Sequence, residues 1–98
     1  MPYEIVIAAE AMEHLQALLA RDRATILDTV EQQLKHTPTM ATRNRKQLRP
    51  NPLAEWELRA GEFRVFFNVI ESEGKVRIMA VGYKEHERLF IGGKEYKL

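Results

Sequence analysis

The chain has 98 residues, of which 45% are hydrophobic and 30% charged, as is usual for one globular domain with a single core. It contains no cysteine, which excludes disulfides and thiolate metal sites and favours a reducing, cytoplasmic location. No apolar run approaches the roughly 18 residues of a membrane span, and the first residues lack the apolar stretch of a signal peptide.

The net charge of +1 is unevenly distributed along the chain. Residues 1–36 carry three bases and six acids, a balance of −3, whereas residues 37–98 carry twelve bases and eight acids, a balance of +4. Four bases and no acid occupy residues 42–50, namely Arg43, Arg45, Lys46 and Arg49. This polarity predicts a basic working surface that binds a polyanion. The alternative is a short basic loop that is merely solvated.

The first part of the chain predicts a strand over residues 3–7, because Tyr3, Ile5 and Ile7 alternate onto one face. A helix is predicted from Ala9 to about Ala20, with the apolar stripe Met12, Leu15, Leu18 and Leu19.

A second helix follows, with Asp22 as its expected N-cap. Its apolar stripe is Ile26, Leu27, Val30 and Leu34. It should stop near His36, since Pro38 lacks a backbone N–H and restricts the residue before it. The short connection at 20–22 makes the two helices an antiparallel hairpin.

Residues 37–54 hold three prolines and the basic cluster, and we expect an irregular, functional loop. A meander of three antiparallel strands should follow at 55–60, 63–70 and 75–83, with turns at 61–62 and 71–74. The tail predicts a hairpin that turns at Gly92 and Gly93. The expected fold class is therefore α+β: one domain over residues 1–98, with a strand and helical hairpin packed on a three- to four-stranded antiparallel sheet.

Alternation gives the meander two faces. The face expected against the helices carries Trp56, Leu58, Phe63, Val65, Phe67, Val69, Val76, Ile78 and Ala80. The opposite, outer face carries Glu55, Glu57, Arg59, Arg64, Phe66, Asn68, Arg77, Met79, Val81 and Tyr83. A mixed basic and apolar face is typical of a binding surface, unless the long loop or the tail covers it.

A two-residue turn at 61–62 places Arg59 directly opposite Arg64, where like charges repel. In one interpretation Glu55 and Glu57 on the same face bridge the two arginines. In the other, the two guanidinium groups converge to hold a phosphate.

Several chemistries are excluded by the sequence. The single serine, Ser72, lies in a turn, and neither GxxxxGK[ST] nor GxGxxG occurs. His14, His36 and His86 are too scattered for a metal cage, so we expect no metal and no cofactor. His86 lies among cations and carboxylates just after Lys84, a setting suited to proton transfer near neutral pH. Cleavage of RNA through its own 2′-OH needs such a group together with cations.

Residues 56–67 (WELRAGEFRVFF) and 78–84 (IMAVGYK) resemble the core of the RelE/ParE superfamily of toxins from toxin–antitoxin pairs. The resemblance extends over about residues 3–90, and its most specific part is the LR-x-GEFRVFF segment at 58–67. It implies an α+β fold and a cognate antitoxin as partner. The RelE branch cleaves mRNA in the ribosomal A site, whereas the ParE branch inhibits DNA gyrase.

Position by position, the resemblance implies a catalytic set of Arg64, Lys84 and His86. Arg64 matches an arginine that contacts the scissile phosphate, and Lys84 matches a basic residue just after the last strand. His86 falls in the stretch where several relatives place an acid or base. The RNA-binding set predicted from charge is Arg43, Arg45, Lys46, Arg49 and Arg59.

The sequence departs from the best-known branch, which has lysines where this chain has Glu55 and Glu57, and a tyrosine where it has Phe90. The favoured function is a ribosome-dependent mRNA endoribonuclease that inhibits translation, with mRNA, the ribosome and an antitoxin as partners. The alternatives are a ParE-like gyrase inhibitor and a catalytically inactive binding protein of the same fold. The modest helical hairpin argues against the first, while the three departures favour the second.

Overall fold

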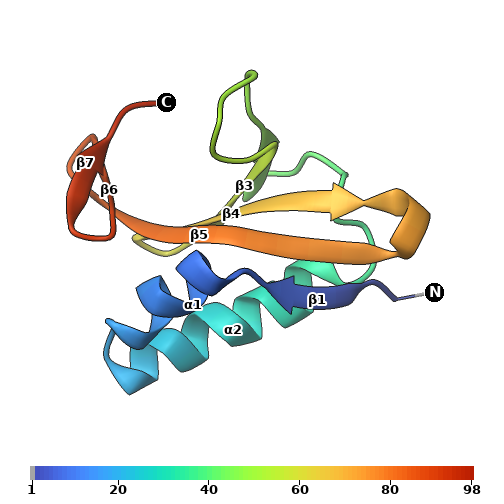
Figure 1. Ribbon diagram of the computed structural model, residues 1–98, viewed down its shortest axis with the longest axis horizontal. Helices are drawn as coiled ribbons and strands as arrows, with labels where there is room; N and C mark the ends of the chain where they lie inside the picture. Colours follow the sequence, from blue (N-terminus) through green and yellow to red (C-terminus); the bar gives the residue numbers. More distant parts are fainter. Residues whose placement is uncertain (1) are drawn as a thin grey trace.

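The computed structural model describes residues 2–98 and places two helices against one face of a twisted sheet (Figure 1). Along the chain the elements are β1 (Glu4–Ile7), α1 (Ala9–Gln16), α2 (Ala20–Leu34), β2 (Arg45–Gln47), β3 (Trp56–Ala60), β4 (Phe63–Ile70), a 3₁₀ turn (Glu71–Glu73), β5 (Lys75–Glu85), β6 (Arg88–Ile91) and β7 (Lys94–Tyr96). The predicted α+β class is confirmed. No helix within residues 2–98 is long and apolar enough to cross a membrane.

The sheet has seven strands, more than the three or four predicted. Strands β2 to β7 follow one another in antiparallel order, and β1 lies parallel to β5. The predicted two-residue turns are both present, with Gly61, Gly92 and Gly93 at φ values of 63°, 60° and 81° that favour glycine. The β3–β4 turn fixes the register in which Arg59 lies opposite Arg64, as predicted.

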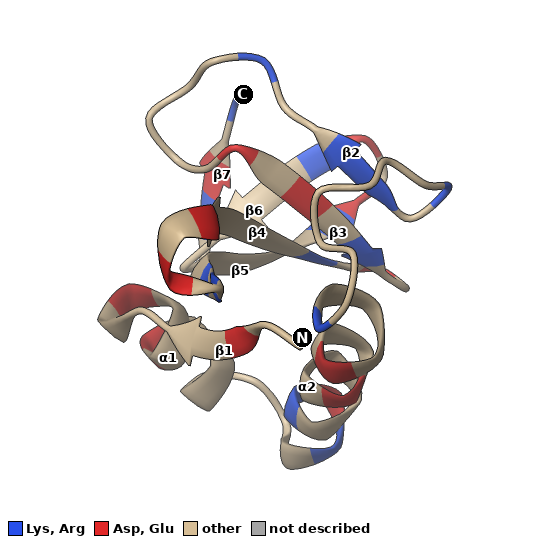
Figure 2. Cartoon of the chain, turned by 90° about the vertical axis from the view of Figure 1, so that its right-hand side faces the viewer, with Lys and Arg blue, Asp and Glu red and all other residues tan. Residues whose placement is uncertain are grey.

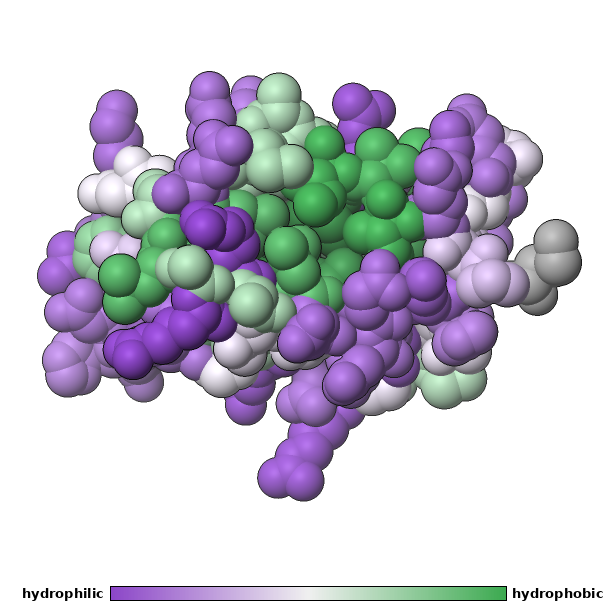
Figure 3. Space-filling view, turned by 90° about the horizontal axis from the view of Figure 1, so that it is seen from below, coloured by the Kyte–Doolittle hydropathy of each residue, from purple (hydrophilic) through white to green (hydrophobic). Residues whose placement is uncertain are grey.

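The main core lies between the helices and the sheet. It contains Leu15, Ile26, Val30 and Leu34 from the helices and Trp56, Leu58, Val65, Phe67, Val76 and Ile78 from the sheet. Tyr3, Ile5 and Ile7 pack against it, as the alternation of residues 3–7 predicts. Apolar residues also gather at the middle of the surface seen from the helix side (Figure 3), in keeping with the partly buried members of this core.

The boundary between the helices differs from the prediction. Helix α1 ends at Gln16 and α2 begins at Ala20, so Leu19 is an extended N-cap that is 61% exposed. Asp22 lies within the first turn of α2, where a carboxylate still suits the helix dipole. The Nη1 of Arg23 donates to the carbonyl oxygens of Leu15 and Leu18 at 3.2 and 3.4 Å. These hydrogen bonds satisfy carbonyls that a longer α1 would have used internally.

The faces predicted for the end of β5 are wrong, because the strand contains a β-bulge. Phe66 pairs with Ala80 and Phe67 with Ile78, which leaves Met79 as an extra residue. After the bulge the alternation is reversed, so Ala80 turns to the outer face and Val81 joins the main core. Tyr83 pairs with Phe63 and turns to the helix side too. As a result Lys84 faces outward, on the same side as Arg64.

The outer face carries a second, smaller core, which accounts for its apolar residues. Ala54, Phe66, Ala80 and Leu89 are buried there, and Leu48, Leu53, Met79, Ile91 and Tyr96 pack against them. Both the loop before β3 and the β6–β7 hairpin thus cover this face, and both rise on the side of the sheet away from the helices (Figure 1). The loop predicted to be irregular contains the short strand β2, which pairs with β3.

Candidate functional site

Basic side chains from several elements converge on a small cleft beside β2. Its volume is about 80 Å³, and it is lined by Arg43, Asn44, Arg45, Lys46, Glu57, Arg59, Arg64 and Lys84. Lysine and arginine cluster on β2 and its flanking loop (Figure 2). The fold therefore brings six of the eight predicted site residues to one cleft, between the sheet and the basic loop.

Arg64 lies at the base of this cleft and is only 8% exposed. Its Nη1 donates to the carbonyl oxygens of Gly61 and Phe63 at 2.7 and 2.9 Å. Its Nε is 3.8 Å from a carboxylate oxygen of Glu57. Burial lowers the pKa of Arg64, and the charge of Arg59 lowers it further, against an opposing effect of Glu57. Burial and Arg59 thus disfavour the charge, whereas Glu57 and the two carbonyl oxygens favour it, and an anion in the cleft would add a further favourable contact.

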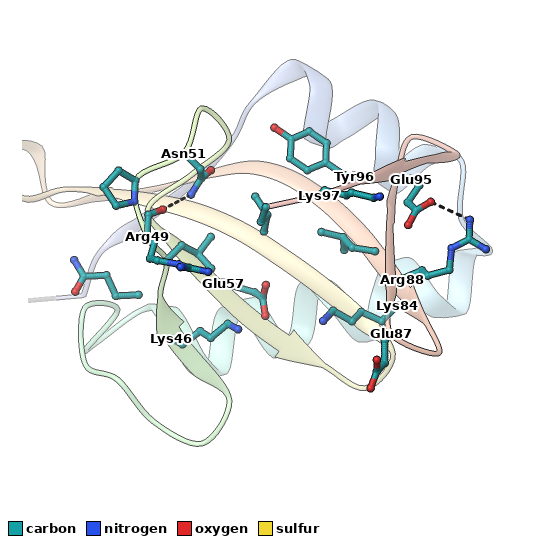
Figure 4. Close-up of a pocket in the computed structure, with 15 residues that line it drawn as sticks. Lys46, Arg49, Asn51, Glu57, Lys84, Glu87, Arg88, Glu95, Tyr96 and Lys97 are labelled. Atoms are coloured by element: carbon teal, nitrogen blue, oxygen red, sulfur yellow. Dashed lines mark hydrogen bonds and ion pairs between the residues drawn. The ribbon is translucent and has the colours of Figure 1, made fainter.

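Glu57 is the one carboxylate that lines the cleft. It is 8% exposed and projects from β3. Lys46 and Lys84 point toward it from opposite sides (Figure 4). From the sequence, Glu57 is either a bridge to Arg59 and Arg64 or a departure from a lysine-bearing pattern, and its carboxylate does lie beside Arg64. In the fold it is a buried carboxylate among cations, and it lines the cleft.

The rim of the cleft is fixed by backbone contacts. The N–H of Arg59 donates to the carbonyl oxygen of Asn44 at 2.7 Å. Two backbone hydrogen bonds between Thr42 and Arg45, one in each direction, close the turn that carries Arg43 and Asn44. Arg43, Lys46 and Arg59 remain exposed. The basic loop is thus held against the sheet with its cations accessible to a ligand.

Arg45 has a different role from the one predicted. It is 6% exposed, and its Nη1 donates to the carbonyl oxygens of Gln33, at 2.9 Å, and of Thr37. These carbonyls lie at and just beyond the end of α2, where a cation also suits the helix dipole. Burial lowers the pKa of Arg45. Arg45 thus borders the cleft, but its charged group ties the basic loop to α2 and is not free to bind a ligand.

His86 and Arg49 lie outside the cleft. His86 occupies the exposed turn between β5 and β6, with a φ of 60°. Lys84 is thus the only residue of the 84–88 stretch that lines the cleft. Arg49 lies farther along the loop and lines a larger groove of about 820 Å³.

The larger groove runs between loop residues 46–51 and the β6–β7 hairpin with its tail. Three residues, Lys46, Glu57 and Lys84, line both the groove and the small cleft. The sequence predicts the hairpin that turns at Gly92 and Gly93 but not this groove. The groove forms because Leu89 and Tyr96 pack on the outer face together with Leu48 and Leu53 of the loop. Among residues 2–98, no three His, Asp or Glu side chains are grouped so that they could hold a metal ion.

No protein-family model and no curated protein sequence matches the chain. Solved structures with the same fold include two toxin–antitoxin complexes. A chain of the toxin–antitoxin complex RelBE2 from Mycobacterium tuberculosis is 23% identical with a TM-score of 0.74, over 86% of this chain and 93% of that one. A chain of the archaeal RelE–RelB complex from Pyrococcus horikoshii is 18% identical with a TM-score of 0.69, over 88% of this chain and 99% of that one. The protein therefore has a RelE-like fold.

Proposed function

We propose that the protein is the toxin of a toxin–antitoxin pair and that it cleaves mRNA on the ribosome, without a metal ion, so that translation stops. One of the two similar structures described above is a complex of RelE with RelB, and the other is the toxin–antitoxin complex RelBE2. A cognate antitoxin is accordingly the expected protein partner, and the cytoplasm, where ribosomes translate, is the expected place of action.

The observation that carries the proposal is the buried position of Arg64 directly opposite Arg59. A buried arginine that faces a second arginine and whose pKa is lowered by burial is typical of a site built for an anion. Arg59, Lys84, Arg43 and Lys46 surround the same cleft. A phosphate of RNA is the anion that suits a guanidinium with further cations around it.

The chemistry proposed is transphosphorylation by the RNA itself. The 2′-oxygen attacks the adjacent phosphorus while its proton passes to the carboxylate of Glu57, and the bond from phosphorus to the 5′-oxygen breaks. Arg64 and Lys84 stabilise the negative charge that builds up on the phosphate oxygens. The departing 5′-oxygen takes a proton from Lys84, with His86 in the adjacent turn as the second candidate donor.

This reaction is tested by primer extension on an mRNA incubated with the purified protein, with and without translating ribosomes. We expect cuts that need the ribosomes. Inhibition of DNA supercoiling by gyrase, with the mRNA left intact, would instead favour the ParE-like alternative. If the protein neither cuts the mRNA nor inhibits gyrase, the result would favour a binding protein of the same fold.

The role of Glu57 is tested by Glu57→Gln, with Glu55→Gln as the matched control. The two residues are neighbours in sequence, but Glu55 is exposed and Glu57 buried in the cleft. We expect cleavage to fall about 10²–10⁴-fold in Glu57→Gln, the usual contribution of a general base, and to be unchanged in Glu55→Gln. Equal rates in the two variants would remove Glu57 from the mechanism.

A further inference from the structure

The groove beside the cleft has the size and the cations of a binding site in its own right. Its volume of about 820 Å³ is in the upper range of ligand pockets. Four cations that line it, Lys46, Arg49, Lys84 and Lys97, form no ion pair with any described residue. Arg88 is the exception, since its Nη2 lies 2.9 Å from the carboxylate of Glu95. The unpaired charge in the groove is therefore mostly positive and suits a polyanion.

The groove also contains an aromatic ring held in place by the sheet. Tyr96 lies directly opposite Leu89 on β6, and both belong to the second core. The ring is only half-buried, and Lys97 follows it along the wall of the groove (Figure 4). A fixed aromatic ring among cations is how proteins hold single-stranded nucleic acid, because bases stack on the ring and phosphates contact the cations. An acidic peptide would use the cations but would have less use for the ring.

The groove opens into the cleft that contains Arg64, since Lys46, Glu57 and Lys84 line both. We propose that a single RNA strand lies in this groove, with one base stacked on Tyr96 and its phosphates on Arg49 and Lys97, and from there enters the cleft. The inference rests on the proposed function and adds a binding site formed by the β6–β7 hairpin.

Stacking is tested with Tyr96→Leu and Tyr96→Phe. Leucine keeps apolar packing on the second core but has no flat ring, whereas phenylalanine keeps the ring. The probe is a fluorescent single-stranded RNA oligonucleotide with 2′-O-methyl groups, which cannot undergo self-cleavage, and binding is followed by anisotropy. We expect Tyr96→Leu to weaken binding about 5- to 150-fold, the range for loss of one stacked base. Tyr96→Phe should bind within about twofold of wild type.

The phosphate contacts are tested with the double variant Arg49→Ala/Lys97→Ala. Its charge-matched control is Arg21→Ala/Lys35→Ala, in the first turn and at the C-cap of α2. We expect the groove variant to lower the slope of log K against log salt concentration by about 1.4, or about 0.7 for each phosphate that the protein no longer neutralises. The control should keep the wild-type slope.

The outcomes separate this inference from the proposed function. Wild-type affinity in Tyr96→Leu, or the same salt slope in both double variants, would overturn the groove assignment even if the protein cleaves mRNA. A second outcome is that an acidic peptide binds without displacing RNA and that the groove variants keep the wild-type affinity for RNA. That result would assign the groove to a protein partner in place of RNA. Tyr96-dependent RNA binding without any cleavage of translated mRNA would support the groove and refute the proposed reaction.

Discussion

Replacing Arg64 by alanine separates its proposed role at the phosphate from its role in the fold. If the guanidinium stabilises charge that develops during cleavage, its loss should slow cleavage about 10²–10³-fold, as for loss of one oxyanion donor. Arg64→Lys should recover little of this rate, since a single ammonium group cannot reproduce the planar fork of donors.

The cost to stability follows from the contacts of Arg64. Its Nη1 donates to two carbonyl oxygens of the β3–β4 turn, and each such bond contributes about 1 kcal/mol. Removing the cation also relieves its repulsion by Arg59 and the penalty of its burial. We therefore expect Arg64→Ala to lose about 1–2 kcal/mol, or about 5–15 °C in Tm for a chain of this size, and to remain folded.

The assay compares wild type, Arg64→Ala and the control Arg77→Ala, an exposed arginine on β5 outside the cleft. Primer extension on translated mRNA gives the cleavage rate, and a thermal melt gives the folded fraction. If Arg64 only ties the β3–β4 turn, Arg64→Ala will melt earlier yet cleave at the wild-type rate per folded molecule. That result would refute the assignment of Arg64 to the phosphate.

Two further predictions concern stability and are read from thermal melts. Arg45→Ala removes the link between the basic loop and the end of α2 and should lower the free energy of unfolding by about 2 kcal/mol. The control Arg43→Ala, at an exposed position, should change it by less than about 0.5 kcal/mol. Equal melting temperatures for the two variants would contradict the role of Arg45 at the end of α2. The N–H of Val81 donates to the Nδ1 of His14 at 3.2 Å, at the stretch of β5 between its pairings with β1 and β6. His14→Leu should therefore cost about 1–2 kcal/mol by leaving that donor unpaired, and the same substitution at the exposed His36 should cost little.

The strands of the meander were predictable because each rests on local rules. A two-residue turn fixes the register of its two strands, so β4 spans the predicted residues and Arg59 faces Arg64. Val65 and Phe67 lie inward as their alternation indicates. Strand β2 was not predictable because its three residues, in a basic loop, carry no periodic pattern, and only its pairing with β3 makes it a strand.

The composition of the site was partly hidden for a similar reason. Nothing in a run of basic residues distinguishes Arg45, which is buried against α2, from its exposed neighbours. That difference depends on carbonyl groups of Gln33 and Thr37, which the fold brings to it. Alternation alone places Glu57 on the outer face where it can bridge Arg64, and its carboxylate lies 3.8 Å from that guanidinium. Its burial was not predictable, because it depends on the loop and the hairpin that cover this face.

The bulge in β5 was invisible because Met79, Ala80 and Val81 are all apolar and suit either face. It nevertheless decides where Lys84 points, and deletions can test this. Without Met79, Ile78 would still face inward, Ala80 outward and Val81 inward, so Lys84 would keep its place beside the cleft.

Deleting Tyr83 removes the same number of residues from β5 but has another consequence. Either Lys84 turns to the helix side, or the bulge is lost and Val81 leaves the core. We expect the Met79 deletion to cost about 1–2 kcal/mol, as for loss of a half-buried methionine, and to retain cleavage within about tenfold, whereas the Tyr83 deletion should lose cleavage or fail to fold. Met79→Ala controls for the lost side chain. An inactive Met79 deletion with a native-like melt, beside an active Met79→Ala, would show that the bend of the bulge, rather than the order of the faces, places Lys84 beside Arg64.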